Sequence, residues 1–188
     1  MALILASKSP RRRELLERLG LEFTVRAADV DETMNPANSP EQEVGALSAR
    51  KAAAISSGED VVVAADTIVV LGDTILGKPK DAADAVRMLK LLGGKTHQVM
   101  TGVTVQRGEK RETFVEKTDV TFRPLSETEI RAYVATGDPL DKAGAYGVQG
   151  MAGAFVSHLG GDFFNVMGLP ICRLCPVLRR FGVTVLGE

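Results

Sequence analysis

The chain has 188 residues, 45% of them hydrophobic and 25% charged, a length that can bury the core of one globular domain over residues 1–188. Its 23 Lys and Arg residues balance 24 Asp and Glu residues, and the net charge of −1 excludes a whole-molecule field that would hold a nucleic-acid backbone. No stretch approaches the roughly 18 apolar residues of a membrane span, and two cysteines cannot build a disulfide framework, so we expect a cytoplasmic protein without a nucleic-acid or membrane partner.

The first half of the chain alternates short apolar runs with helical patterns. The run 3–6 has no basic residues before it, which predicts a buried strand and not a signal peptide. Pro10 suits the first turn of a helix, and Gly20 suits its end. The expected elements are this strand, a helix over 11–19, a strand over 22–27, a polar loop over 29–40 and a helix with an inner face of Val44, Leu47 and Ile55.

The second half opens with a strand that is too apolar for an exposed sheet edge. This run, 61–71, is interrupted only by Asp66 and Thr67. After it we expect a hairpin turn at 72–73, a helix over 81–92, strands between 97 and 122, a helix from Ser126 to Gly137, a glycine-rich polar region over 137–153 and a final helix from about Pro170 to Arg179. This mixture predicts an α/β or α+β fold around one mixed sheet.

A cluster of hydroxyls and cations, 7–12, lies between the first strand and the first helix. Ser7, Arg11 and Arg12 are its main polar members. Unpaired backbone N–H groups and the helix dipole favour an anion at such a place, and arginine adds bidentate donors for phosphate. The alternative is a capped helix with solvated arginines, because basic residues in a first turn oppose the dipole.

Asp66 stands inside the apolar strand. Desolvating a carboxylate there is costly unless a cation lies beside it. A carboxylate held by a sheet can orient a metal or accept a proton from water, and both uses suit phosphoryl chemistry. A purely structural alternative is that Asp66 and Thr67 bond backbone groups at an irregularity of the strand.

The segment 72–78 satisfies the G-x-x-x-x-G-K part of a phosphate-binding P-loop. Pro79 stands where Ser or Thr would bind the metal, and the intervening residues predict a hairpin, so we reject a P-loop here. Lys78 and Lys80 remain candidate point charges for phosphate, with a solvated turn as the alternative.

The region 138–150 concentrates glycines and different polar side chains. Its glycines allow a ligand to approach the backbone, and Gln149 offers both a donor and an acceptor to a base edge. An ordinary long loop is the alternative. Cys172 and Cys175 form a Cys-x-x-Cys pair, which is typical of a redox site or of half a zinc site. No second cysteine pair accompanies them, so we expect them to pack as small residues on one helical face, with redox or metal use as the alternative.

Taken together, these segments resemble the Maf family of nucleotide pyrophosphatases, also described as septum-formation inhibitors. The resemblance covers nearly the whole chain. Its motifs, in order, are Leu5-Ala6-Ser7-Lys8-Ser9-Pro10-Arg11-Arg12, Ala65-Asp66-Thr67, Gly77-Lys78-Pro79-Lys80-Asp81, His97-Gln98-Val99-Met100-Thr101-Gly102-Val103, Asp141-Lys142-Ala143-Gly144-Ala145-Tyr146-Gly147-Val148-Gln149-Gly150 and Asn165-Val166-Met167-Gly168-Leu169-Pro170.

The resemblance implies a two-lobed fold around an elongated mixed sheet with a nucleotide cleft between the lobes. It also implies Mg²⁺ or Mn²⁺ as cofactor, attack of water on the α-phosphate, and a homodimer. The segment 141–150 resembles the branch acting on dTTP and UTP, not the branch acting on 7-methyl-GTP.

By position, the resemblance also implies roles for single residues. Asp66 matches the catalytic proton acceptor and, with Glu32, the metal side of the site. The phosphate-site residues matched are Ser7, Arg11, Arg12, Lys51 and Lys78, and the positions matched to base specificity are Arg11, Thr67 and Gln149.

Two other classes of function remain open from the sequence. A nucleotide-binding regulator of cell division would bind nucleoside triphosphate with little turnover, whereas the enzyme would release pyrophosphate from dTTP. Nucleic-acid binding through 8–13 is the weaker alternative, because the rest of the chain supplies no extended basic surface.

Overall fold

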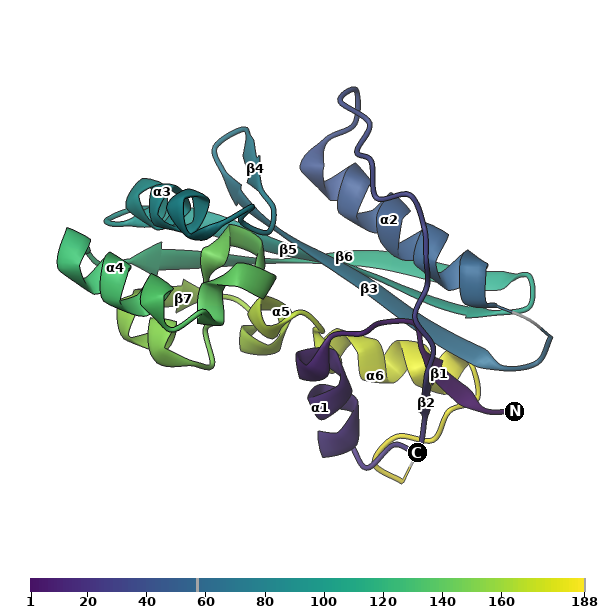
Figure 1. Cartoon of the computed structure of the whole chain (residues 1–188). Helices are drawn as coiled ribbons and strands as arrows, with labels where there is room; N and C mark the ends of the chain where they lie inside the picture. Colours follow the sequence, from purple (N-terminus) through teal and green to yellow (C-terminus); the bar gives the residue numbers. More distant parts are fainter. Residues whose placement is uncertain (57, 188) are drawn as a thin grey trace. The chain divides into compact units, whose positions relative to one another are not determined.

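The computed structural model describes residues 1–56 and 58–187. Figure 1 shows their arrangement as an α/β fold. Within these residues the strands are β1 (Leu3–Leu5), β2 (Thr24–Val25), β3 (Val61–Leu71), β4 (Thr74–Leu76), β5 (Thr96–Arg107), β6 (Lys110–Phe122) and β7 (Val156–Gly160). The α-helices are α1 (Pro10–Arg18), α2 (Pro40–Ile55), α3 (Ala82–Leu92), α4 (Glu127–Ala135), α5 (Phe163–Met167) and α6 (Ile171–Arg180), and the 3-10 helices are η1 (Asp138–Asp141), η2 (Ala143–Ala145) and η3 (Met151–Phe155).

The strands form one mixed sheet in the order β2-β1-β3-β5-β6-β7, and β4 pairs with β3. β1 is parallel to both β2 and β3, with Ile4 opposite Val62, whereas β4 and β7 pair antiparallel to their neighbours. Parallel neighbours need a crossover connection, and the chain supplies α1 between β1 and β2 and α2 between β2 and β3. The expected mixed sheet is therefore confirmed.

The chain divides into two compact units. Unit 1 comprises Met1–Asp66, Thr101–Glu116 and Gly168–Glu188. Unit 2 comprises Thr67–Met100 and Lys117–Met167. Strands β3, β5 and β6 contribute residues to both units, and β3 leaves unit 1 directly after Asp66.

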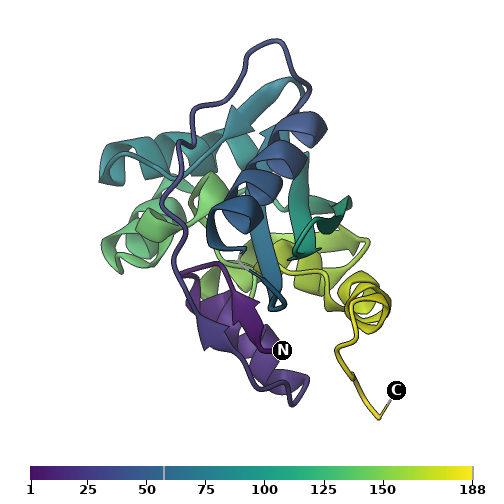
Figure 2. The same cartoon turned by 90° about the vertical axis from the view of Figure 1, so that its right-hand side faces the viewer.

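Unit 1 contains the parallel strands and α2. Figures 1 and 2 both show α1 beside β1 at the start of the chain. Helix α2 begins with a capping box between Ser39 and Gln42 and with Pro40 in its first turn, which together satisfy N–H groups that the helix leaves unpaired. A small buried cluster joins this helix to the strands: Ile4, Ala6, Ala52, Val62 and Ala64.

Helix α2 lies very close to β5. A Cβ atom on Gly102 would overlap the backbone oxygen of Val44, so only glycine allows this approach. The Ser48 hydroxyl is buried and bonds the hydroxyl of Thr104 at 2.8 Å. These contacts fix the helix against the sheet, and with it every side chain that the helix carries.

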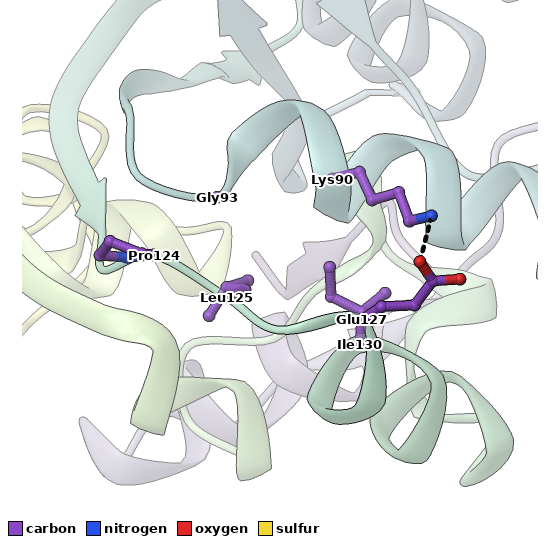
Figure 3. Close-up of a pocket in the computed structure, with 6 residues that line it drawn as sticks. All are labelled: Lys90, Gly93, Pro124, Leu125, Glu127 and Ile130. Atoms are coloured by element: carbon purple, nitrogen blue, oxygen red, sulfur yellow. Dashed lines mark ion pairs between the residues drawn. The ribbon is translucent and has the colours of Figure 1, made fainter.

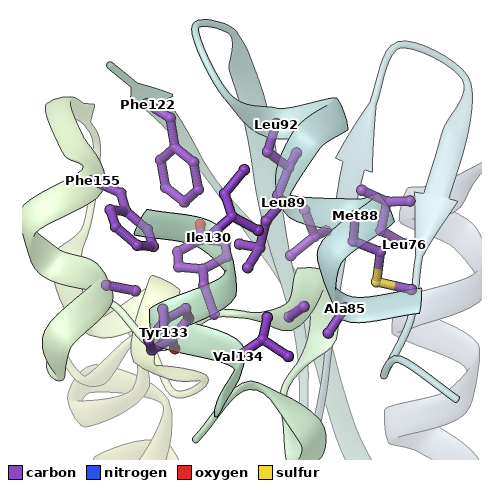
Figure 4. Close-up of a cluster of buried hydrophobic side chains, with 14 of the residues drawn as sticks. Leu76, Ala85, Met88, Leu89, Leu92, Phe122, Ile130, Tyr133, Val134 and Phe155 are labelled. Carbon is purple, nitrogen blue, oxygen red and sulfur yellow. The ribbon is translucent and has the colours of Figure 1, made fainter. Parts of the chain in front are cut away.

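An apolar core of buried side chains lies in unit 2 (Figure 4). Helix α3 begins at the N-cap Asp81 and α4 at a capping box between Ser126 and Glu129. The labelled members of the core come from both helices, from β4 and β6 and from η3: Leu76, Ala85, Met88, Leu89, Leu92, Phe122, Ile130, Tyr133, Val134 and Phe155.

The elements expected from the sequence are found near their predicted positions, with two differences. The strand expected over 22–27 shrinks to β2, whose two residues are exposed at the sheet edge. The strand expected over 61–71 is confirmed with the same bounds as β3, and its burial is interrupted at Asp66 and Thr67. The glycine-rich region, expected as a polar loop, contains three short 3-10 helices.

The 72–78 segment forms the antiparallel hairpin of β3 and β4, with Val70 opposite Ile75, which agrees with the rejection of a P-loop. Among the described residues, no helix is both long enough and apolar enough to cross a membrane.

Candidate active site

Asp66 and Thr67 interrupt the buried stretch of β3. The five residues before Asp66 are buried and have apolar side chains, whereas the Asp66 side chain is 16% exposed. The ammonium of Lys51, on α2, contacts its Oδ1 at 2.8 Å. The sequence predicted that Asp66 needs a cation beside it, because desolvating a carboxylate is costly in free energy. Lys51 is that cation.

Lys51 joins two acids. Its Nζ atom also lies 2.7 Å from Oε1 of Glu32, in the polar loop before α2. The Lys51 side chain is only 11% exposed, whereas that of Glu32 is 64% exposed. In this structure Lys51 thus pairs with the two carboxylates whose metal roles the resemblance implies.

The neighbouring acid, Asp31, has different partners. Its Oδ1 accepts a hydrogen bond from the backbone N–H of Thr33 at 2.9 Å. The bonds from Thr33 lower the pKa of this carboxyl. Asp31 stabilises the loop conformation, and Glu32 is the acid that reaches Lys51.

Arg12 lies in the same group of charges. Its guanidinium donates to the Ser7 hydroxyl at 3.0 Å and to the backbone oxygen of Gly168 at 2.8 Å. Burial lowers its pKa, and the charges of Asp66 and Glu32 act in the opposite direction. The alternative of solvated arginines therefore fails for Arg12.

The remaining arginines of α1 differ from Arg12. Arg11 is partly exposed in the first turn of the helix, and its charge contributes to lowering the pKa of Arg12. Arg13 is exposed and pairs with Glu17 at 2.7 Å along the helix surface. The first turn of α1 contains no acidic residue, and the N-cap Ser9 makes no side-chain capping bond.

Ser7 is buried, and its hydroxyl also accepts a hydrogen bond from the backbone N–H of Ser9 at 3.2 Å. Six of the predicted site residues belong to unit 1: Ser7, Arg11, Arg12, Glu32, Lys51 and Asp66.

The other three predicted residues, Thr67, Lys78 and Gln149, belong to unit 2. Thr67 follows Asp66 on β3 and is partly exposed. Lys78 is exposed just after β4, and the preceding Gly77 accepts a backbone hydrogen bond from Gly144 at 3.0 Å. Gln149 is exposed in a tight turn of the glycine-rich region.

The donor set in unit 1 fits a hard divalent cation. Glu32 and Asp66 both contact one nitrogen atom, so their oxygens can also reach one metal ion. Mg²⁺ is commonly held by one or two carboxylates together with substrate phosphates and water. Among residues 1–56 and 58–187, no group of three or more His, Cys, Asp and Glu side chains is arranged to hold a metal by itself, so the nucleotide must supply further oxygens.

The two cysteines are unlike metal ligands. Both thiols are free on α6, and burial raises the pKa of Cys175, which disfavours the thiolate. Cys175 is half-buried, but Cys172 is exposed, so the expectation that both pack on one helical face is wrong for Cys172.

A pocket of about 320 Å³ lies in unit 2 between α3 and the start of α4 (Figure 3). Lys90 and Glu127 form an ion pair of 3.1 Å at one side of it, and Leu125 and Ile130 supply apolar lining. None of the predicted site residues lines this pocket.

Some contacts of the site were not predicted. The backbone oxygen of Gly168 that receives Arg12 lies in a motif segment, Asn165 to Pro170, but no role had been given to it. Gly102 also lies in a motif segment, and its close contact with α2 explains the glycine. No local pattern pointed to Tyr133, which contacts the turn that bears Gln149.

Fold and charges together define an α/β protein in which acids and cations cluster around Asp66 of β3. The chain belongs to the family described as Maf-like protein, whose model matches residues 2–181.

Its relatives include proteins named dTTP/UTP pyrophosphatase. The one from Bacillus cytotoxicus is 52% identical over 180 residues, covering 95% of this chain and 94% of that protein. The one from Bacillus pumilus is 50% identical over 184 residues, covering 97% of each. Among solved structures, a HAM1 protein from Coxiella burnetii shares the fold with a TM-score of 0.52 at 13% identity, covering 96% of this chain and all of that one.

Proposed function

We propose that this chain is a nucleoside triphosphate pyrophosphatase that hydrolyses dTTP and UTP to the monophosphate and pyrophosphate with a divalent metal. The observation that carries this proposal is the contact of one lysine with two carboxylates beside the partly buried Arg12, whose guanidinium is held by Ser7 and Gly168. This arrangement stands in a chain that is about half identical to proteins named dTTP/UTP pyrophosphatase.

Asp66 is the proposed proton acceptor. β3 holds its carboxylate rigidly, and a general base must lie within hydrogen-bond reach of the water that it activates. The water oxygen forms a bond to the α-phosphorus, Asp66 takes the proton, and the bond from the α-phosphorus to the bridging oxygen breaks. Pyrophosphate leaves with the electron pair of that bond.

A metal ion would be held by Glu32 and Asp66 together with triphosphate oxygens. When bound, Mg²⁺ or Mn²⁺ supplies charge stabilisation at the phosphates. Glu32 is exposed and stands in a loop, so it can adjust its position as the triphosphate arrives.

The cations are proposed to bind the phosphates. Arg12 is oriented by Ser7 and by the backbone of Gly168, so little reorganisation is needed when it meets an anion. Arg11 and Lys78 add charge from exposed or partly exposed positions. Lys51 has to exchange at least one carboxylate for a phosphate oxygen.

Base selection is assigned to Arg11, Thr67 and Gln149. Arginine donates only, whereas threonine and glutamine can both donate and accept, so together they can match a pyrimidine edge. The cytoplasm, where nucleoside triphosphates and reduced thiols occur together, is the proposed compartment.

A nucleotide panel tests the proposal. Purified protein is incubated with dTTP, UTP, CTP and 7-methyl-GTP, each with Mg²⁺, with Mn²⁺ or with EDTA, and the products are separated by ion-exchange chromatography. We expect monophosphate and pyrophosphate from dTTP and UTP only when metal is present. Nucleoside diphosphate and orthophosphate would show cleavage between the β- and γ-phosphates and would contradict the proposal. Binding of the nucleotide without turnover would favour a nucleotide-binding regulator.

A further inference from the structure

Gln149 stands in a closed turn whose two ends are glycines. The N–H of Gly150 donates to the backbone oxygen of Gly147 at 3.1 Å, so Val148 and Gln149 are the central residues of the turn. Gln149 is exposed there. The direction of its side chain therefore depends on how the ends of the turn are held.

Tyr133 holds the first end. Its hydroxyl accepts the backbone N–H of Gly147 at 3.3 Å and donates to Oδ2 of Asp138 at 2.7 Å. The Tyr133 side chain comes from the buried face of α4. Burial and the contact with Asp138 raise the pKa of Tyr133, and the bond from Tyr133 lowers the pKa of Asp138, so near pH 7 the tyrosine keeps its proton and donates to an anion.

Asp138 and Lys142 complete the support. Lys142 donates to Oδ1 of Asp138 at 3.1 Å and to its backbone oxygen at 2.6 Å. The stem of Lys142 crosses Gly147 so closely that a Cβ there would lie 2.8 Å from Cε. At the other end of the turn, a Cβ on Gly150 would lie 3.6 Å from Oδ2 of Asp138. Both ends of the turn thus lie against one hydrogen-bonded group.

The position of the turn matters because a glutamine amide can present either a hydrogen-bond donor or an acceptor to a base. One side of the amide donates and the other accepts, so a freely moving Gln149 can match uracil or cytosine equally well. Discrimination between these bases requires the amide to meet the base edge from a fixed position.

We propose that Tyr133 and Asp138 are positioning residues for base selection, which hold the Gln149 turn so that uracil and thymine are preferred over cytosine. The proposal rests on the proposed function for the role of Gln149. It assigns no part in the chemical step to Tyr133 or Asp138, whose contacts are with the turn that bears Gln149.

The test compares equilibrium binding of the non-hydrolysable α,β-imido analogues of UTP and CTP, with Mg²⁺, to the wild type and to Tyr133→Phe. Loss of one or two hydrogen bonds at the turn is expected to reduce the UTP preference about three- to tenfold. In steady-state assays of UTP, KM should rise while kcat changes less than about twofold. Circular dichroism and thermal melting check that the variant is folded.

A double-mutant cycle tests whether Tyr133 acts through Gln149. Tyr133→Phe should change the UTP preference much less in a Gln149→Ala background than in the wild type. Asp138→Asn, which keeps the side-chain shape and removes the charge, should reproduce part of the effect. The matched control is Glu127→Gln on the exposed surface of the same helix, where Glu127 pairs with Arg131 at 2.6 Å, and this change should leave the preference as it is.

The outcomes separate this inference from the proposed function. An unchanged preference in folded Tyr133→Phe, or a full effect in the Gln149→Ala background, would overturn the positioning role. Absence of any UTP preference in the wild type would overturn it too. If the wild type prefers the UTP analogue and Tyr133→Phe loses that preference, but UTP is never hydrolysed, the proposed function fails and the positioning role stands.

Discussion

At the scale of single residues, the central feature is a lysine shared by two acids. In the unit 1 group, Glu32 and Asp66 carry negative charge, whereas Arg11, Arg12 and Lys51 carry positive charge. A divalent ion that arrives without nucleotide meets carboxylates whose negative charge is already balanced by neighbouring cations. A metal bound to a triphosphate brings negative charge with it, and that charge gives the cations new partners.

Asp66→Asn tests the base. The amide keeps the side-chain shape but cannot accept the proton of the attacking water and is a poorer metal ligand, so pyrophosphate release from dTTP should slow on the order of a hundredfold or more. Asp73→Asn, in the exposed turn between β3 and β4, is the matched control and should keep the wild-type rate. Normal turnover by a folded Asp66→Asn protein would remove Asp66 from the mechanism.

Lys51→Met tests the competition between lysine and metal. Removing the ammonium leaves two neighbouring carboxylates without their shared cation, so Mn²⁺ should bind about tenfold more tightly in the absence of nucleotide. Electron paramagnetic resonance titration of free Mn²⁺ measures this affinity. Arg50→Met removes a cation from the adjacent position of the same helix and should have little effect, whereas equal or weaker Mn²⁺ binding by Lys51→Met contradicts the competition.

His97 makes the stability of unit 2 depend on pH. It is buried, its Nε2 bonds the Tyr146 hydroxyl at 2.8 Å, and burial lowers its pKa from 6.5 to about 4. The folded state therefore requires neutral His97. The unfolded chain takes up a proton first as the pH falls, so the stabilisation is present above about pH 6.5 and is lost between pH 6.5 and pH 4.

Urea unfolding at pH 7 and pH 4.5 measures this effect. His97→Gln should lose less stability than the wild type between these pH values, by about 2 to 3 kcal/mol. Other acids titrate in the same window, so the difference between proteins is the relevant quantity. The exposed His158 supplies the control, since His158→Gln should retain the wild-type dependence.

At the scale of elements, α2 positions the lysine of the site. Gly102→Ala would push the helix from β5, because the new methyl group meets backbone and not a flexible side chain. We expect the free energy of unfolding to fall by about 1 to 3 kcal/mol, and turnover of dTTP to fall as Lys51 shifts. Urea unfolding and a steady-state assay measure the two effects.

The control for this helix shift is Gly93→Ala. A Cβ at Gly93 meets its nearest neighbours at ordinary distances of 3.5 and 3.6 Å, so little destabilisation is expected there. If Gly102→Ala and the wild type have the same free energy of unfolding, the close approach of α2 to β5 does not depend on glycine at this position.

The elements themselves were largely predictable. The helical spacing of apolar residues and the caps at Asp81 and Ser126 located α3 and α4 within about a residue. β2 was predicted too long, because edge exposure and pairing length depend on the neighbouring strand and not on the local apolar pattern.

At the scale of the whole molecule, ligand linkage provides a test that needs no turnover. The α,β-imido analogue of dTTP with Mg²⁺, at about a hundredfold excess over its Kd, should stabilise the folded chain by about 2.7 kcal/mol. For a chain of this size we expect Tm to rise by about 5 to 10 °C. EDTA should abolish most of this shift, and a shift of the same size without metal would contradict a metal-dependent site.

The sequence by itself determined most of the elements, the mixed sheet and the residue types of the candidate site, whereas β7 and α5 were not predicted. Asp66 was recognisable because a carboxylate within an apolar strand carries a desolvation cost that demands a partner. The motif order indicated the family, which the family model and the relatives confirm.

Only the tertiary structure decided which groups meet. Lys51 was expected at phosphate and is found on two carboxylates, Arg12 bonds a backbone oxygen 156 positions away, and Tyr133 reaches Gly147 from another element. Local patterns report periodicity and the cost of burial, both of which depend on near neighbours in the chain. The partner of a buried charge or hydroxyl depends on how distant segments are brought together, and that is settled by the packing of the whole fold.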